Sequence, residues 1–333
     1  PTANGFGKIA LEPIGISAPD AVVIGTEDTE VQYLASTGSG ASIGFQTPSA
    51  ANRKNVNTLV GVGATGNQPT ALLFRNFSGD ASPDILVSLS GTPNDATHKI
   101  LMLENGLGTT LVNFPFADTA ANAVEVSLGG LTGPIEIAAG NFDGTGINSL
   151  DVAIINAVTE TLSLILFDAT GTPLLVSPAI TLPGTPAGVG VGDFDGDGDE
   201  DIVVTGILTA STSFFRVFLS DGTGQFITVG DTFDVTGIFG ELTVADINQD
   251  NLSDVMIAST AGRLEIFFSS FSAIDGPNAF NRATVTLSDT PDEIFVHIIN
   301  ADWNNDGKPD LALAASTPVG VSSPTDIFTV LTQ

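Results

Sequence analysis

The strongest constraint on the fold is a run of alternating aspartates at residues 193–201, Asp-Phe-Asp-Gly-Asp-Gly-Asp-Glu-Asp, which leads directly into the apolar residues 202–204. Oxygen-bearing side chains at positions 1, 3, 5 and 9, with glycine near the bend, are what a loop needs to surround a hard cation with oxygens at ~2.3–2.6 Å. We therefore expect a calcium loop between two strands.

Four other stretches follow the same plan, and each ends in an aspartate that precedes an apolar run. They lie at 76–84, 141–151, 246–254 and 302–310, with two residues inserted before the last aspartate of 141–151. The closing aspartates recur about every 50–67 residues, and self-similarity at a period near 50 indicates a propeller or a solenoid.

Composition agrees with a repeat fold made of many short strands. Hydrophobic residues make up 42% of the 333 residues, enough for a sizeable core, and 37 Gly and 18 Pro suit strands joined by turns. Because the blades of one ring share a core, we expect one all-β domain over 1–333, a β-propeller of four-stranded antiparallel blades, six in number with seven as the alternative. The expected blades are 20–69, 70–133, 134–186, 187–240, 241–293 and 294–333.

The chain ends bear on how such a ring closes. Residues 5–11 resemble segments that come late in other repeats, at 105–112 and 222–229, so we expect them to supply the outer fourth strand of the last blade. Residues 20–25 would then form the innermost strand of the first blade. The turn at 26–30 lacks the calcium spacing, and we expect this blade to be metal-free, with a cation held by Glu27, Asp28 and Glu30 as the weaker alternative.

Two hydrophobic patterns accompany the loops. The strand after each loop is apolar on both sides, as at 202–204 and 311–313, which is typical of a strand sandwiched between neighbouring blades. Phe77, Phe142, Phe194 and Trp303 occupy position 2 of their loops. We expect a hydrophobic anchor beneath each of these loops.

Net charge restricts the partners. The chain carries a net charge of −29, from 38 acidic against 9 basic residues, which argues against nucleic acid and anionic membranes as partners and favours cations.

The chain has no cysteine and no apolar run of about 18 residues, so we expect no disulfide and no direct membrane insertion. The given sequence begins at Pro1 with no basic n-region and no apolar h-region, so we expect a mature or excised soluble module. Loops of modest charge match the affinities of extracellular modules, which favours an extracellular or cell-surface location, with the periplasm as the alternative.

The unit at 190–204, followed by Phe-Leu-Ser-Asp-Gly-Thr-Gly-Gln-Phe at 218–226, resembles the FG-GAP/VCBS repeat of the integrin α-subunit propeller and of many secreted bacterial proteins. The resemblance implies that about five Ca²⁺ ions bind in the loops between strands one and two of each blade. It carries ligand roles onto positions 1, 3, 5 and 9 of the five loops: Asn76, Ser78, Asp80, Asp84, Asn141, Asp143, Thr145, Asp151, Asp193, Asp195, Asp197, Asp201, Asp246, Asn248, Asp250, Asp254, Asp302, Asn304, Asp306 and Asp310. The integrin propeller has seven blades, and Asn76, Ser78 and Thr145 replace carboxylates, which should weaken two sites.

Catalytic patterns are lacking in the sequence. His98 and His297 lie in different blades and outside any HExxH or Ser/His/Asp context, so we expect no enzyme. We expect a non-catalytic binding, adhesion or structural module, and the alternative is a lectin or a glycan-active enzyme module. A protein or glycan partner would bind the rim opposite the calcium loops, where the candidate loops are 90–98, 206–213 and 316–325, beside 117–123 and 288–293.

Overall fold

The computed structural model describes residues 6–12, 20–25, 30–37, 44–45, 49–59, 68–78, 80, 82–90, 99–106, 116, 119, 123–127, 135–144, 150–168, 171–229, 235–236, 239–259, 263–272, 276–286, 294–301, 306–316 and 327–331. Strands dominate these residues, with two short 3-10 helices, η1 (Ala50–Asn52) and η2 (Val56–Thr58). The expected all-β class is confirmed. Neither of these helices has the length and apolar character needed to cross a membrane.

The chain forms two compact units. The first comprises Pro1–Asn141 and Thr145–Ile180, and the second comprises Phe142–Gly144 and Thr181–Gln333. In both, neighbouring strands within a sheet are antiparallel, as expected.

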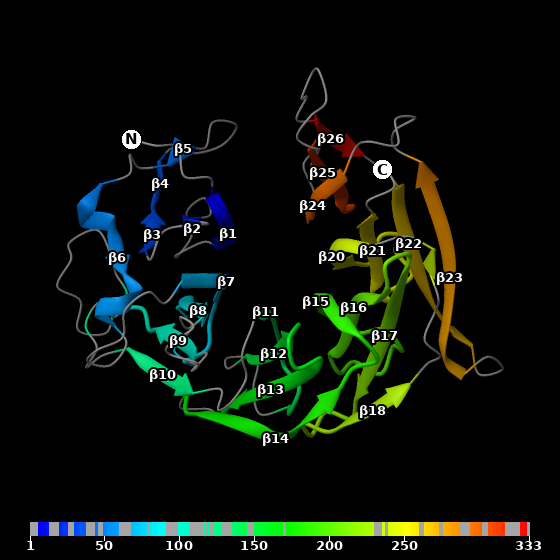
Figure 1. The fold of residues 1–333 in the computed structure, drawn as a ribbon, viewed down its shortest axis with the longest axis horizontal. Coiled ribbons are helices and arrows are strands. Elements are labelled where there is room, and N and C mark those ends of the chain that lie inside the picture. Colours follow the sequence, from blue (N-terminus) through cyan, green and yellow to red (C-terminus); the bar gives the residue numbers. More distant parts are fainter. Residues whose placement is uncertain are drawn as a thin grey trace. The chain divides into compact units, whose positions relative to one another are not determined.

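The first unit holds three sheets of four strands (Figure 1). Their strands, in spatial order, are β1 (Phe6–Glu12), β2 (Asp20–Gly25), β3 (Glu30–Leu34) and β6 (Arg53–Asn55); β7 (Gln68–Arg75), β8 (Asp84–Ser90), β9 (Lys99–Leu103) and β10 (Val124–Ser127); and β11 (Ile135–Gly140), β12 (Asp151–Asn156), β13 (Thr161–Phe167) and β14 (Pro173–Thr181). The short strands β4 (Ser36–Thr37) and β5 (Gly44–Phe45) pair with each other. The first strands of consecutive sheets, β1, β7 and β11, adjoin.

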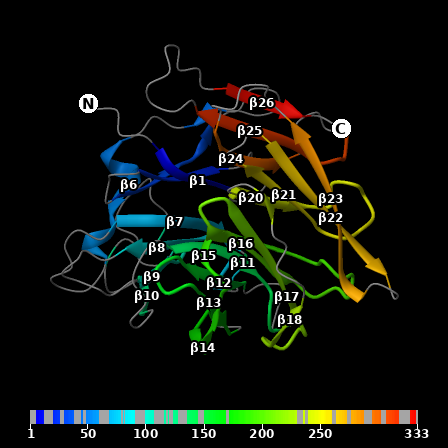
Figure 2. The ribbon, with the colours of Figure 1, turned by 45° about the vertical axis from the view of Figure 1, so that its right-hand side comes forward.

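The second unit repeats this plan, and the long β22 and β23 hairpin stands out in Figure 2. Its strands are β15 (Thr185–Gly192), β16 (Asp201–Thr209), β17 (Thr212–Ser220), β18 (Phe226–Val229) and β19 (Val235–Thr236); β20 (Phe239–Ala245), β21 (Asp254–Ser259), β22 (Arg263–Ser272) and β23 (Gly276–Thr286); and β24 (Ile294–Ala301), β25 (Asp310–Ser316) and β26 (Ile327–Leu331). Strand β19 pairs with β17 beside β18. The first strands β15, β20 and β24 again adjoin.

The expectation that residues 5–11 close a ring as the outer strand of the last blade is wrong. Strand β1 pairs antiparallel with β2, with Ile9 opposite Val23, and forms the first strand of the first sheet. Residues 20–25 are therefore second in the sheet and not innermost. The physical reason is local: a connection of residues 13–19 closes a hairpin at far lower entropic cost than pairing the two chain ends.

The strand that follows each of the five loops is buried at consecutive residues, and so on both faces, as the apolar runs predicted. Along β8, alternate residues enter different cores: Ile85, Val87 and Leu89 pack with the first sheet, while Leu86 packs with the third. Strands β12 and β16 are buried along six consecutive residues from their first aspartates. Because each fully buried aliphatic side chain contributes about 1.5–3 kcal/mol, these strands contribute strongly to the stability of the packing between sheets.

Glycines let two first strands approach closely in the second unit. In β15, Gly188, Gly190 and Gly192 are buried and alternate with half-buried residues. A Cβ atom on Gly190 would lie 2.6 Å from Leu242 Cδ1 of β20, closer than any real contact. The glycines therefore make room for the side chains of the next sheet.

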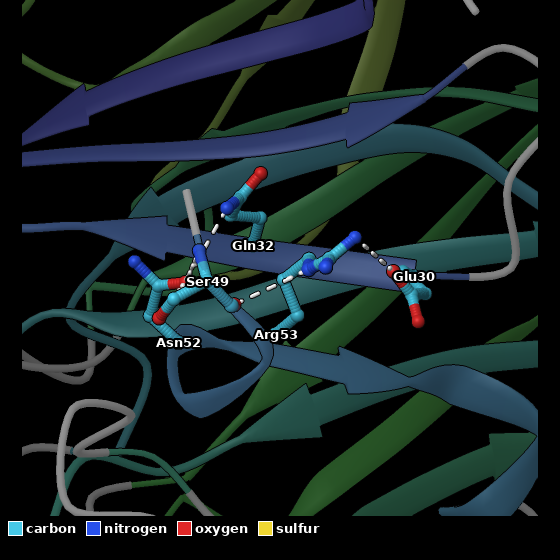
Figure 3. Close-up of polar contacts among 5 residues, drawn as sticks. All are labelled: Glu30, Gln32, Ser49, Asn52 and Arg53. Atoms are coloured by element: carbon cyan, nitrogen blue, oxygen red, sulfur yellow. Dashed lines mark hydrogen bonds and ion pairs between the residues drawn. The ribbon is translucent and has the colours of Figure 1, made fainter. Parts of the chain in front are cut away.

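In the first sheet, polar contacts hold η1 against β3 (Figure 3). The amide oxygen of Asn52, which is 1% exposed, accepts hydrogen bonds from the Ser49 backbone at 2.8 Å and from Gln32 Nε2 at 3.3 Å. Arg53 donates to the Ser49 carbonyl at 3.2 Å and pairs with Glu30 at 3.2 Å. Glu30, an alternative cation ligand by sequence, is thus paired with an arginine; residues 27 and 28 lie outside the described residues.

Candidate metal centre

The five loops occupy equivalent places in their sheets. Each joins the first strand to the second: 76–84 follows β7, 141–151 follows β11, 193–201 follows β15, 246–254 follows β20 and 302–310 follows β24. In every case the closing aspartate is the first residue of the second strand. The hairpin geometry therefore places each loop at the same end of its sheet.

In loop 193–201, three predicted ligands converge. Asp193, Asp195 and Asp197 each place a carboxylate oxygen within 4.8 Å of the others. Among the residues that the structure describes, this is the group of at least three acidic, histidine or cysteine side chains with the spacing of a metal site. Carboxylate oxygens are the ligands that Ca²⁺ prefers, so the donor set fits a hard divalent cation.

Backbone hydrogen bonds fix the path of this loop. The Asp193 carboxylate accepts from Gly196 N–H at 2.7 Å and from Gly198 N–H at 3.1 Å, and the Asp195 carboxylate accepts from Asp197 N–H at 3.2 Å. Gly196 and Gly198 have φ values of +79° and +94°, a region that glycine enters without strain. A carboxylate oxygen that accepts one hydrogen bond keeps a second lone pair, so the three aspartates remain able to bind a cation.

Electrostatics oppose this arrangement in the absence of a cation. Burial, and then the neighbouring carboxylates of Asp197 and Asp193, raise the pKa of Asp195. Like charges held this close favour the protonated form, and a divalent cation removes that penalty. The loop is therefore folded in a geometry that a cation would stabilise.

The closing aspartate has a structural role that the sequence did not reveal. Asp201 is 0% exposed; its Oδ2 accepts from Phe194 N–H and its Oδ1 accepts from Ser220 N–H, both at 2.9 Å. It thereby ties the start of the loop to the end of β17. Burial raises the pKa of Asp201 to about 7, against the lowering effect of these two hydrogen bonds.

The same pair of hydrogen bonds recurs in two other sheets. Asp84 joins Phe77 N–H to Asn105 N–H, and Asp254 joins Ile247 N–H to Ser269 N–H, at 2.9–3.1 Å. Asp151 accepts from Phe167 N–H at 2.9 Å, and both Asp151 and Asp310 are 0% exposed. The metal-ligand role of these closing aspartates stays a prediction beside this observed role.

Loop 246–254 follows the backbone of loop 193–201 with different side chains. The Asp246 carboxylate accepts from Asp250 N–H at 3.0 Å and from Asn251 N–H at 2.9 Å, and Asn248 Oδ1 accepts from Asp250 N–H at 2.9 Å. Gln249 and Asn251 take positive φ values of +63° and +69° where the other loop has glycines. Two carboxylates and one amide thus occupy positions 1, 3 and 5.

The remaining loops are described in part. In 76–84, Asn76 and Ser78 are half-buried, Asp80 is exposed and its carboxylate accepts from Ser82 N–H at 2.8 Å. Asn141 and Asp143 are half-buried, while Thr145 lies outside the described residues, as do Asp302, Trp303 and Asn304. For these loops the ligand sets stay predictions.

The aromatic anchors are confirmed where the structure describes them. Phe77 and Phe142 are 0% exposed and Phe194 is 2% exposed. Phe77 packs against Phe167 with ring centroids 5.8 Å apart, and Phe142 packs edge-on against Phe226 at 5.5 Å. Position 2 of each of these loops is therefore held in the core.

A second repeated turn joins the third and fourth strands, and its hydrogen-bonding pattern was not predicted from the sequence. In 168–172 and 221–225 the first residue is an aspartate whose carboxylate accepts from the backbone N–H of the fifth, at 3.0 and 3.3 Å. Gly171 and Gly224 have φ values of +75° and +80°. The repeated Asp-x-x-Gly spacing was the signal that could have located this turn.

Few residues of the loops expected to bind a partner belong to the part of the chain that the structure describes. Residues 206–213 do not form the predicted loop, because β16 continues to Thr209 and β17 begins at Thr212. Residues 91–98, 117–118, 120–122, 288–293 and 317–325 lie outside the described residues, and His98 is among them. His297 is part of β24.

Comparisons with known proteins give the fold alone. No family model matches the chain, and no curated protein matches it. Among solved structures, the chain is similar to a functionally unknown protein from Desulfotomaculum acetoxidans DSM 771, with a TM-score of 0.56 and 11% identity, over 99% of this chain and 90% of that chain. At this identity the likeness extends to the all-β architecture of antiparallel sheets and no further.

Proposed function

We propose that this protein is a calcium-binding propeller module of the FG-GAP/VCBS type that serves in binding, adhesion or structure without catalysis. The observation that carries the proposal is the convergence of Asp193, Asp195 and Asp197 in a loop whose backbone is already fixed by hydrogen bonds. The other four loops repeat its position and closing aspartate. Calcium at several loops would stabilise the hairpins between first and second strands.

Two features support a propeller of six blades, and a third bears on how the ring would close. Successive antiparallel sheets each begin with a strand that adjoins the first strand of the next sheet within its unit. Buried clusters lie between consecutive sheets, as between the first and second and between the fifth and sixth. The sixth sheet has three strands among the described residues, and β1 belongs to the first sheet, so closure of the ring would not use β1 in the way the sequence suggested.

Charge guides the proposal on setting and partners. With a net charge of −29, the protein would repel nucleic acid and anionic membranes and attract cations. An extracellular or cell-surface setting would supply calcium at the level that loops of this kind require. A protein or glycan held at the rim opposite the calcium loops would then be the partner.

The test measures calcium binding to the chelator-treated full chain by titration calorimetry. The free energy of unfolding is measured in parallel, with and without calcium. Calcium at 100 times its Kd should raise the free energy of unfolding by about 2.7 kcal/mol for each site. Asp197→Asn should remove the site in loop 193–201. Asp199→Asn is the matched control, because it removes the same charge from position 7, whose side chain is not a predicted ligand.

Two results would contradict the proposal. The first is native protein that takes up no calcium and unfolds at the same temperature with chelator and with calcium. The second is an equal loss of calcium binding in the Asp197→Asn and Asp199→Asn variants, which would indicate diffuse attraction to an acidic surface and not a site.

A further inference from the structure

Hydrogen bonds connect the loops of consecutive sheets within each unit. The carbonyl oxygen of Asp193, at position 1 of its loop, accepts from the backbone N–H of Ser253 at 2.7 Å. The carbonyl oxygen of Asn76, also at position 1, accepts from the N–H of Leu150 at 3.4 Å. Ser253 and Leu150 each immediately precede a closing aspartate. In both units, therefore, the residue before one closing aspartate holds the first residue of the preceding loop.

A second contact reaches position 2 of a loop from the turns between third and fourth strands. In the second unit, Phe142 O accepts from Gly224 N–H at 2.8 Å and from Ser220 Oγ at 3.3 Å. In the first unit, a Cβ atom on Gly171 would lie 3.0 Å from Ser78 Cα and 3.5 Å from Phe77 O. Each of these loop segments is thus clasped at its start by a backbone element that comes later in the chain.

Two loops cannot make the hydrogen bond that Ser253 and Leu150 donate. Proline stands before the closing aspartate at Pro83 and Pro309, and proline has no N–H to donate. In the second unit, Gln249 Nε2 instead donates to Gly307 O at 3.4 Å across loops 246–254 and 302–310. The loop backbone therefore accommodates proline before the closing aspartate when this backbone hydrogen bond is not made.

We propose that loops 193–201 and 246–254 bind divalent cations cooperatively, coupled through the hydrogen bond from Ser253 N–H to the carbonyl of Asp193. This proposal rests on the proposed calcium function and concerns the regulation of the same site. A residue that leads into the fifth sheet would thus contribute to the cation affinity of loop 193–201, which belongs to the fourth sheet.

The coupling between the two loops follows from the residues that the Ser253–Asp193 hydrogen bond joins. Asp193 supplies position 1 of the acidic cluster, so fixing its carbonyl limits where its carboxylate can lie. Ser253 is bonded in sequence to Asp254, whose carboxylate ties Ile247 N–H at 3.1 Å to Ser269 N–H at 2.9 Å. A cation that orders loop 246–254 would hold Ser253 in place, and thereby reduce the ordering that loop 193–201 requires when it binds its own cation.

The experiment uses the full chain and Ca²⁺ alone. Hydrogen exchange of the segment covering 193–201 is followed as calcium is added, which gives a calcium midpoint for that loop. Ser253→Pro removes the N–H with a residue that two other loops carry at this position. Ser253→Ala, which keeps the N–H, is the control. Asp250→Asn weakens the partner loop without touching the hydrogen bond.

We expect Ser253→Pro to raise the calcium midpoint of loop 193–201 by about two- to tenfold, the effect of losing one backbone hydrogen bond, while Ser253→Ala leaves it unchanged. Asp250→Asn should also raise this midpoint in the native background, and should have no further effect in Ser253→Pro. If Ser253→Pro does not fold, the effect of Asp250→Asn on the native chain decides.

Other outcomes overturn the coupling. An unchanged midpoint in Ser253→Pro, an equal shift in Ser253→Ala, or no effect of Asp250→Asn would each do so while leaving calcium binding intact. Native protein whose loop shows no calcium midpoint would instead contradict the proposed function, and the coupling with it. The two failures are therefore distinguishable.

Discussion

Loops 193–201 and 246–254 follow one backbone path with different side chains. In both, the position 1 carboxylate accepts from the N–H of position 6, at 3.1 and 2.9 Å, and positions 4 and 6 have positive φ. One loop uses glycine at both of these positions, and the other uses Gln249 and Asn251. The carboxylates at position 1 and at the end of the loop therefore define its shape, and glycine at positions 4 and 6 lowers the backbone strain.

The two loops differ more in charge than in shape. Burial raises the pKa of Asp201 to about 7 and that of Asp254 to about 6. Asp195 and Asp197 add repulsion at Asp201, whereas Asp250 alone does so at Asp254, because Asn248 replaces a carboxylate. We therefore expect a bound cation to stabilise loop 193–201 more than loop 246–254.

The largest expected effect is the loss of stability when a closing aspartate is removed, and it tests whether this residue is equally important in both loops. Asp201→Ala leaves the buried N–H groups of Phe194 and Ser220 without acceptors, and each such group costs about 1–3 kcal/mol. We expect a loss of about 3 kcal/mol in the free energy of unfolding, measured by urea denaturation in chelator. Asp254→Ala should lose a similar amount.

Asp221→Ala is the control for this comparison, because it removes a carboxylate from an exposed turn of the same unit and should cost less. A loss in Asp201→Ala no larger than that of the control would contradict the structural role of the closing aspartate.

The next effect separates the two loops by pH. A carboxyl whose pKa is raised in the folded state binds a proton there before it does in the unfolded chain, so it destabilises the fold as pH rises from the unfolded pKa of about 4 to the folded value. For Asp201 this window ends at about 7, and for Asp254 at about 6. In chelator, stability should therefore fall between pH 4 and 7 through these groups.

Melting temperatures of two matched variants check this expectation. Asp201→Asn should flatten the profile between pH 6 and 7, while Asp254→Asn should leave that interval unchanged. Saturating calcium should reverse the trend, because cation binding requires ionised carboxylates. Identical profiles for the two variants would contradict the difference in charge environment.

Sequence periodicity predicted much of this architecture for a physical reason. Each loop must be followed by a strand buried on both faces, so the motif and the apolar run mark the same boundary, as at Asp201 and Ile202. The aromatic at position 2 could be placed in the core because a polar loop needs an apolar anchor, and Phe194 is 2% exposed. Ligand spacing also located the acidic cluster.

Long-range choices could not be predicted in the same way. Strand β1 has an apolar pattern that suits either the first sheet or the last, and pattern alone does not say which edge it joins. The closing aspartates looked like ligands because a carboxylate at position 9 satisfies the loop motif. Their hydrogen bonds to Ser220 and Ser269 link residues 15–19 positions away and have no local signal.

A smaller effect tests the role of glycine in loop 193–201. Gly198 has a φ of +94° and no atom within 4 Å of a Cβ placed on it, so Gly198→Ala changes backbone strain without creating a clash. We expect a loss of about 1–2 kcal/mol in chelator, measured by urea denaturation. Gly206→Ala, at a site where a Cβ would lie 2.4 Å from Thr185 O, should lose more and distinguishes a clash from strain. No loss in Gly198→Ala would show that the loop relaxes freely.

The smallest expected effect is the reverse change in loop 246–254. Gln249 holds a φ of +63°, which costs a side chain with a Cβ about 1 kcal/mol, so Gln249→Gly should recover part of that strain. The gain should be a few tenths of a kcal/mol, because glycine is also more flexible in the unfolded chain and the 3.4 Å hydrogen bond to Gly307 O is lost. Gln249→Ala separates these terms, since it loses the hydrogen bond and keeps the strain. If Gln249→Gly is less stable than Gln249→Ala, then backbone strain at position 4 does not distinguish the two loops, and Gly196 at position 4 of loop 193–201 serves instead the close approach of Leu252, whose Cδ2 lies 3.0 Å from a Cβ placed on Gly196.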